Sequence, residues 1–262
     1  MSIDLCAAQV LRADPDRFRA AMAAPLPGRG ALLVLGAFNL EVARAPWVTQ
    51  EPLIAQMRLQ WWRDAVEEIY TGKPPRAHEV VTPLAEVIQS HDLPRALFER
   101  IIDARVGDIA REAPASREAV WRYLEQTGGA LTTLGAGVLG ASEAEAATLG
   151  ALGTVQAAAR LVEALPALQA AGAKPLPESD APEDQVSQLA LEAQDRLADL
   201  RTGAHWPVRK ALRPALLAGS EAEAILTAAR NAPAAALAGD GAVRSEFRKR
   251  FTRLRLAATG RF

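Results

Sequence analysis

The sequence predicts an all-α protein, and three observations support this. Alanine supplies 56 of the 262 residues, and it is the strongest helix former and a weak strand former. Aromatic residues make up only 5% of the chain. No stretch keeps the alternating apolar and polar pattern of a strand, whereas apolar residues recur at helical spacing. Half of the residues are hydrophobic, and the length suits one large domain over residues 1–262.

The expected helices begin and end at capping residues, prolines and glycines. Asp14 and Pro15 have the N-cap and first-turn chemistry of a helix start. Pro46 ends the next helix, and Pro166 is expected to kink or end a later one. After the short helix at Asp14, helices are expected over residues 29–45, 51–70, 77–90, 94–112, 116–139, 141–171, 183–201, 208–218, 220–230 and 242–258.

Charge and cysteine usage exclude several classes of protein. The chain has 30 basic and 31 acidic residues, which argues against a nucleic-acid binder that works by bulk phosphate neutralisation. Its single cysteine, Cys6, cannot form an intramolecular disulfide and is expected to be a packing residue. The apolar runs are too short to span a bilayer, and the first residues lack the features of a signal peptide. These features predict a cytoplasmic protein.

Positive charge is concentrated at the C-terminal end. Residues 241–262 hold seven basic residues and one acidic residue, a net charge of +6. Phe247, Phe251 and Leu254 lie at i, i+4 and i+7, so one helical face is apolar. That face either packs on the core, or it contacts an anionic membrane surface or a protein partner, peripherally at the inner membrane. The residues of this second interpretation are Arg248, Lys249, Phe251, Arg253 and Arg255.

The segment ALLVLGAFNLEVA at residues 31–43 is apolar on nearly all sides, which is typical of a buried helix. Its polar side chains are Asn39 and Glu41, which need partners if they are buried. Arg44, three residues after Glu41, can supply one. The two groups therefore form a satisfied polar pair or line a cavity inside the bundle.

Five segments in sequential order resemble the squalene/phytoene synthase family. Its members are all-helical head-to-head prenyltransferases of the isoprenoid synthase fold, so the resemblance implies one helical bundle with a central cavity. The segments are residues 29–44, RLQWWRDAVEEIYTG (58–72), LFERIIDARVGDI (97–109), WRYLEQTGGALTTLGAGVLG (121–140) and GTVQAAARLVEALPALQAAGAKPLP (153–177).

The resemblance also indicates which polar residues lie nearest the cavity. By their positions in the family pattern they are Asn39, Glu41, Arg58, Asp108, Gln156 and Arg160. Asp108 has a second interpretation, a surface ion pair with Arg105 or Arg111.

The sequence departs from the family where the family binds magnesium. Two aspartate-rich motifs hold Mg²⁺ in that family, and the metal clamps the substrate diphosphate. Here residues 37–44 contain one acid, Glu41, and residues 151–177 contain no aspartate and one glutamate, Glu163. We expect Arg160 to pair with Glu163. No catalytic residue and no cofactor is therefore expected, and Glu41, Glu163 and Asp108 would have to hold Mg²⁺ if the chain were active.

The variant first motif looks most like a divergent branch of the family. That branch includes the mitochondrial complex I assembly factor and its alpha-proteobacterial relatives. The resemblance implies a non-catalytic protein that binds an isoprenoid or quinone-like lipid, or a protein of a respiratory complex. Two alternatives stay open: an active Mg²⁺-dependent prenyltransferase with altered ligands, and a helical scaffold whose core is filled.

Overall fold

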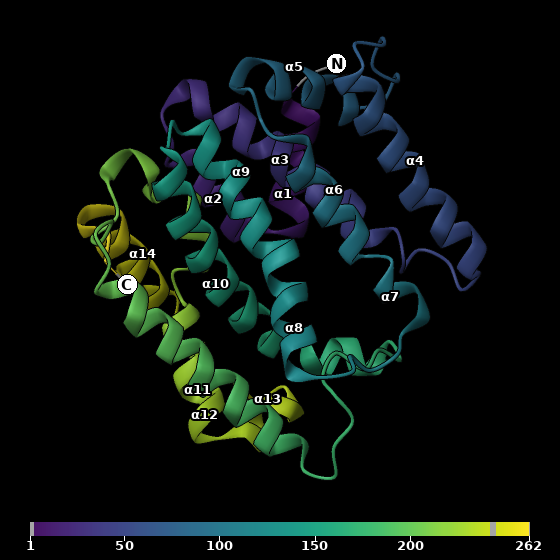
Figure 1. Ribbon diagram of the computed structural model, residues 1–262. Helices are drawn as coiled ribbons and strands as arrows, with labels where there is room; N and C mark the ends of the chain where they lie inside the picture. The colour runs from purple at the N-terminus through teal and green to yellow at the C-terminus, as the bar shows by residue number, and fades with distance from the viewer. Residues whose placement is uncertain (1–2, 242–244, 262) are drawn as a thin grey trace.

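The computed structural model describes residues 3–241 and 245–261, and over these residues it contains helices and turns but no strand (Figure 1). The all-α prediction is confirmed. The helices are α1 (Ile3–Ala13), α2 (Pro15–Met22), α3 (Leu26–Arg44), α4 (Pro52–Tyr70), α5 (Val81–His91), α6 (Arg95–Ala104), α7 (Gly107–Ala110), α8 (Arg117–Leu124), η1 (Glu125–Gly129), α9 (Ala130–Val138), α10 (Glu143–Ala170), α11 (Pro182–Arg201), η2 (Lys210–Ala215), η3 (Leu217–Gly219), α12 (Ala222–Asn231), α13 (Pro233–Ala238) and α14 (Glu246–Thr259).

Several boundaries differ from the expected ones. The first helix, α1, was not expected, although Cys6 and Val10 lie four residues apart and are both buried. The helix expected over residues 94–112 is divided into α6 and α7, and 208–218 forms 3₁₀ turns. Helix α13 was not expected either. Residues 242–244 of the expected C-terminal helix lie outside the described residues.

Of the two outcomes expected at Pro166, an end of the helix is wrong, because α10 continues through it to Ala170. Proline removes one backbone hydrogen bond and crowds the preceding turn. Helix α10 packs against α9, α11, α12 and α13, and Leu165, next to the proline, is fully buried. Tertiary packing on several sides therefore keeps this helix intact.

The buried side chains form two clusters. The first joins α1, α3, α4, α5, α6 and α9, and its centre is Phe38, whose ring meets Trp62 and Phe98 edge to face at centroid distances of 5.6 and 5.3 Å. The second surrounds α10, α11 and α12. Helix α10 touches α9 and η1 as well as α11 and α12, so it links the two halves of the molecule (Figure 1).

Helices α8 and α9 are joined by a π-helical turn, η1, which lies against α10. Two glycines allow this close approach. A Cβ on Gly128 would lie 2.5 Å from the Ala157 Cβ, and one on Gly129 would lie 2.5 Å from the Thr154 Oγ1. Because side chains are absent at both positions, η1 and α10 form one tightly packed wall beside the cavity described next.

Candidate functional site

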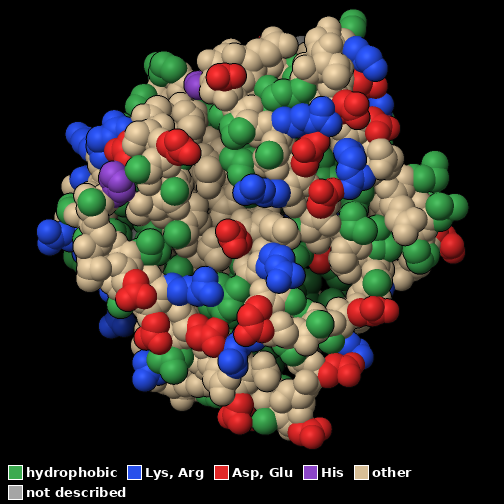
Figure 2. Space-filling model, viewed as in Figure 1, with side chains coloured by type: hydrophobic (Ala, Val, Ile, Leu, Met, Phe, Trp, Pro, Cys, Tyr) green, Lys and Arg blue, Asp and Glu red, His purple; other side chains and the backbone are tan. Residues whose placement is uncertain are grey.

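A cavity of about 610 Å³ opens between α7, α8, η1 and α10. Its surface side appears in Figure 2 as a hollow with charged side chains of both signs around it. The volume is within the range of small-molecule sites. The lining residues that matter below are Arg17, Asn39, Trp47, Arg105, Asp108, Arg111, Glu112, Pro114, Val120, Tyr123, Thr127, Arg160, Leu161, Ala164, Leu168 and Lys174.

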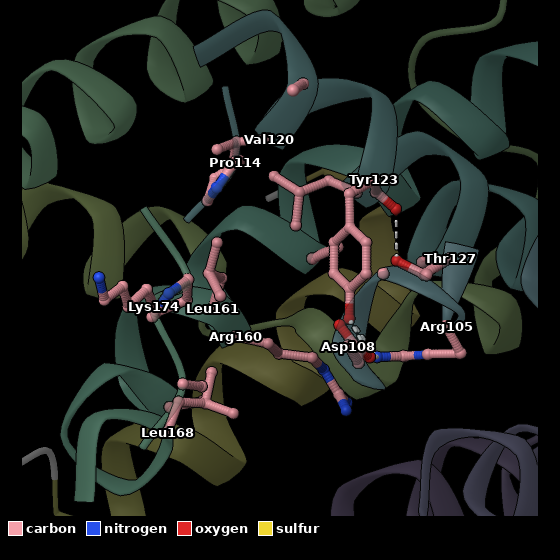
Figure 3. Close-up of a pocket in the computed structure, with 18 of the residues that line it drawn as sticks. Arg105, Asp108, Pro114, Val120, Tyr123, Thr127, Arg160, Leu161, Leu168 and Lys174 are labelled. Atoms are coloured by element: carbon pink, nitrogen blue, oxygen red, sulfur yellow. Dashed lines mark hydrogen bonds and ion pairs between the residues drawn. The ribbon is translucent and has the colours of Figure 1, made fainter. Parts of the chain in front are cut away.

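One end of the cavity is polar and is built from α6, α7 and α8. The Tyr123 hydroxyl donates a hydrogen bond to Asp108 Oδ2 at 3.0 Å, and Arg105 Nη1 contacts the same oxygen at 3.2 Å. Arg105 Nη1 also donates to the Tyr123 hydroxyl oxygen. Figure 3 shows the Tyr123 ring pointing its hydroxyl at Asp108. The three side chains thus form a closed hydrogen-bonded triangle that faces the cavity.

Burial dominates the ionisation of the two acidic members of this triangle, whereas burial of Arg105 is outweighed by Tyr123 and Asp108 together, so that its pKa is raised. Burial raises the pKa of Asp108, although Arg105 and the Tyr123 hydroxyl oppose the change. Burial also raises the pKa of Tyr123 far above neutral, so the phenol stays protonated and remains a donor. The arrangement holds the hydroxyl proton between the phenol and the carboxylate.

A second charged group lies where α2 meets α10. Asp14 Oδ2 accepts hydrogen bonds from Arg17 Nε at 3.0 Å and from Arg160 Nη1 at 2.7 Å. Burial opposes ionisation of Asp14, but the two guanidiniums and their hydrogen bonds hold its pKa well below its usual range. The carboxylate therefore stays charged, and it supplies one negative charge to Arg17 and Arg160, which both line the cavity.

The other end of the cavity is apolar. Val120, Leu161 and Leu168 lie on this side in Figure 3, away from the Tyr123 hydroxyl. Arg111 and Trp47 also line the cavity, and the Arg111 Cζ atom lies over the Trp47 ring, 5.3 Å from its centroid. Lys174 also lies on this side in Figure 3, beside Leu161, and it pairs with Glu178 at 2.6 Å. The cavity therefore has the Asp108 triangle at one end and mainly apolar side chains at the other.

The structure brings together three of the six residues expected near the cavity. Asn39, Asp108 and Arg160 line it. Asp108 pairs with Arg105, as its alternative interpretation stated, but it is largely buried rather than on the surface. Arg160 pairs with Asp14 and not with Glu163, because its guanidinium reaches α2 and the Ala218 carbonyl.

The other three residues do not line the cavity. Glu41 faces α1, where it accepts a hydrogen bond from Gln9 and pairs with Arg44 at 3.5 Å. Arg58 is exposed on α4. Gln156 is buried, and its Nε2 donates to the Leu216 carbonyl at 2.8 Å. The sequence order of family motifs does not specify which face of a helix turns inward, and this explains the difference.

The residues present do not fit the two-sided magnesium clamp of the family. Glu41 is on the wrong side of α3, and Glu163 is exposed on α10. Asp108 is already engaged by Arg105 and Tyr123. Among the described residues, no three His, Cys, Asp or Glu side chains come together as a metal site would need.

The C-terminal helix α14 is held on the body by residues other than its apolar face. Leu256 is fully buried, and Arg253 pairs with Asp16 of α2 at 2.6 Å. Phe247, Phe251 and Leu254 are 76%, 59% and 67% exposed. Of the two interpretations of this face, packing of the three side chains on the core therefore does not hold, although the helix itself is docked on the body. Arg253 is turned toward the body, and Lys249 pairs with Glu246 at 3.2 Å.

Sequence reasoning missed three residues of the charged end. Asp14 was recognised only as a helix cap, and Arg17 and Tyr123 were not singled out. Arg105 was named as one of two ion-pair partners of Asp108, and the two residues have the i, i+3 spacing of a helical ion pair. The contact from Asp14 to Arg160 spans 146 residues and has no local signal.

Comparison with known sequences places the chain among relatives that carry a named role. It is 30% identical over 141 residues to "NADH dehydrogenase (ubiquinone) complex I, assembly factor 6" of Mus musculus, and 27% identical over the same length to the Homo sapiens protein of that name. The matches cover 54% of this chain and 42% of each relative. The chain thus matches less than half the length of these relatives.

Solved structures show the same fold at low identity. A dehydrosqualene synthase superposes with a TM-score of 0.78 at 14% identity, covering 98% of this chain and 95% of the other. A squalene synthase from Alicyclobacillus acidocaldarius gives 0.73 at 16% identity, covering 87% and 93%. The family model for squalene/phytoene synthase matches residues 10–201. Since that match spans most of the chain, the protein belongs to the squalene/phytoene synthase family.

Proposed function

We propose that this chain is a non-catalytic member of the family that holds an isoprenoid or quinone-like lipid in its cavity. The observation that carries the proposal is the cavity itself. It has an apolar end at Val120, Leu161 and Leu168, and the residues that the structure describes place no cluster of three or more carboxylates at its charged end. A prenyl diphosphate could enter such a site, but the ligands that hold magnesium in the family are not in place there.

Native mass spectrometry of the purified chain tests lipid binding. Ala164→Phe fills the cavity wall from α10, and we expect it to abolish the bound lipid signal. Ala147→Phe, on the exposed face of the same helix, is the matched control and should retain the lipid. If both variants keep the bound lipid, the assignment of the lipid to this cavity is contradicted.

A turnover assay tests the absence of catalysis. Incubation with farnesyl or geranylgeranyl diphosphate and Mg²⁺ should release no pyrophosphate above background. Release that depends on Glu41, Glu163 or Asp108 would instead establish the alternative, an active prenyltransferase with altered ligands.

The biological role that we propose is assistance in the assembly of a respiratory complex. The support is the likeness to relatives named as complex I assembly factors. Cells that lack the chain should lose assembled complex I, and Ala147→Phe should restore it. If Ala164→Phe also restored complex I, the assembly role would not depend on the cavity.

A second proposal concerns α14, which we assign to an anionic membrane surface. Phe247, Phe251 and Leu254 form one exposed stripe. Arg248 and Arg255 lie along one side of it and Arg250 along the other, at helical spacing. Apolar side chains flanked by arginines suit the interface of an anionic bilayer. Among the described residues, no helix is long and apolar enough to cross a membrane.

Vesicle flotation tests this surface. The chain should bind phosphatidylglycerol-containing vesicles, and the binding should weaken as salt rises because the arginines are screened. Phe247→Ser with Phe251→Ser should abolish binding. Leu53→Ser with Met57→Ser removes exposed apolar side chains from α4 instead and should leave binding unchanged. Equal loss in both double variants would contradict a specific role of α14.

A further inference from the structure

The charged end of the cavity carries more positive than negative charge. Five cationic side chains line the cavity, and two acidic ones do. Three of the cationic side chains, Arg17, Arg105 and Arg160, lie at the charged end together with the carboxylates of Asp14 and Asp108. Of the other two, Arg111 covers Trp47, and Lys174 lies on the apolar side in Figure 3 and pairs with Glu178. Three guanidiniums therefore lie beside two carboxylates at this end.

The arrangement around Asp14 leaves one charge uncompensated. Arg17 and Arg160 both bind the same carboxylate oxygen, so two guanidiniums share one negative charge. Burial lowers the pKa of Arg17 to about 10, and repulsion from Arg160 adds to the decrease despite the pairing with Asp14. Two guanidiniums that share one carboxylate would gain from a second anion.

Two guanidiniums at this end, those of Arg17 and Arg105, also have donors to spare. Among the described residues, the Arg17 side chain uses only its Nε in a hydrogen bond. On the opposite wall, Arg105 uses Nη1 for Asp108 and Tyr123, while its buried Nε has no hydrogen-bond partner within the described part of the chain. A buried donor without an acceptor is costly. An anion at this end would accept from these groups.

We infer that the charged end binds the anionic head group of a single-chain amphiphile directly through arginines, without a divalent metal. The inference rests on the lipid-binding function proposed above and names the chemical class of the ligand. Guanidinium donors match the oxygens of a phosphate group. The tail of the amphiphile would lie along Val120, Leu161 and Leu168, at the apolar end.

Calorimetric titration with matched probes tests the inference. Dodecyl phosphate, dodecanol and dodecyltrimethylammonium share one tail and differ in head group. In EDTA we expect dodecyl phosphate to bind about tenfold or more tightly than dodecanol, since one hydrogen bond to a charged group is worth that factor. The ammonium probe should bind most weakly, and added Mg²⁺ should not improve the affinity for the phosphate.

Variants locate the effect. Arg160→Gln and, separately, Arg105→Gln should weaken dodecyl phosphate about tenfold or more and leave dodecanol affinity unchanged, which also shows that the cavity is intact. Arg58→Gln removes an exposed arginine outside the cavity and should change neither. If one of the two cavity variants also alters dodecanol binding, it has changed the shape of the cavity, and the head-group site is judged from the other variant.

The outcomes separate the inference from the function on which it rests. Equal affinity for dodecanol and dodecyl phosphate overturns the anion site while the lipid cavity stands. Phosphate binding that requires Mg²⁺ overturns the metal-free mode. Binding of none of the three probes overturns the lipid cavity, and the inference with it.

Discussion

Asp14 performs two tasks with one carboxylate. It caps α2, because its Oδ1 accepts from the Arg17 backbone N–H at 2.9 Å. Its Oδ2 is the shared counterion of Arg17 and Arg160. The first task is local and was predicted from the Asp-Pro pair. The second depends on α10 and was not, because the partner lies far away in the sequence.

Removing this carboxylate should destabilise the protein in a pH-dependent way. The pKa of Asp14 is depressed in the folded state. Its contribution to stability is therefore present above the unfolded pKa near 4 and is lost as the pH falls through the lower folded value. We expect Asp14→Ala to reduce the free energy of unfolding by roughly 2–4 kcal/mol at neutral pH, from the lost cap and the two unpaired arginines.

Urea denaturation at neutral and acidic pH measures this difference, which should shrink in acid. Asp180→Ala, in the exposed segment between α10 and α11, is the control and should have little effect. A deficit for Asp14→Ala that stays constant with pH would show that the cap alone matters.

The interlock between η1 and α10 is the main feature at the scale of helices. Helical spacing of apolar residues predicted the helix over 141–171 closely. The structure adds a capping box of Ser142 and Glu145 at its start. Sequence analysis predicted the helix over 116–139 as regular. The π-turn within it was missed, because Gly128 and Gly129 carry no pattern that separates a π-turn from a flexible helix.

Gly129 gives a test of this interlock. We expect Gly129→Ala to reduce the free energy of unfolding by about 1–3 kcal/mol, because the added methyl group overlaps Thr154 Oγ1. Thr154→Ala removes that oxygen, so the double variant should recover part of the loss. Thermal denaturation of the two single variants and the double variant gives the coupling. If the stability changes of the two single variants simply add in the double variant, the crowding comes from the backbone of α10 and not from Thr154 Oγ1.

At the scale of the whole molecule, the fold was more predictable than the site. Composition and helical periodicity specify an all-α bundle, because they depend on local preferences. The cavity depends on which faces of α3, α7 and α10 meet, and only Asn39, Asp108 and Arg160 of the expected set turn toward it. If the predicted orientation of a helix is wrong by one face, the predicted fold is still correct, but a residue assigned to the site no longer lies there.

Two aromatic residues, Phe38 and Phe247, differ sharply in their burial. Phe38 is fully buried among Trp62 and Phe98, whereas Phe247 is 76% exposed. Phe38→Ala should lower the free energy of unfolding by about 3–5 kcal/mol, and Phe247→Ala by little. Denaturant midpoints measure both. A large loss for Phe247→Ala would show that α14 packs more closely than its exposure indicates.

The π-turn at residues 125–129 also bears on how relatives can diverge. A π-turn fits one more residue into its turn than an α-helix does, and each residue turns a helix by about 100°. Tyr123 lies before the turn and Leu131 after it, and both line the cavity. The extra residue of the π-turn contributes to the angle between these two side chains around the helix axis. Deleting one residue here would leave composition and charge almost unchanged yet rotate one wall of the cavity against the other. Ligand preference in such a bundle can therefore change through the length of one helix, with every lining residue still present in the sequence.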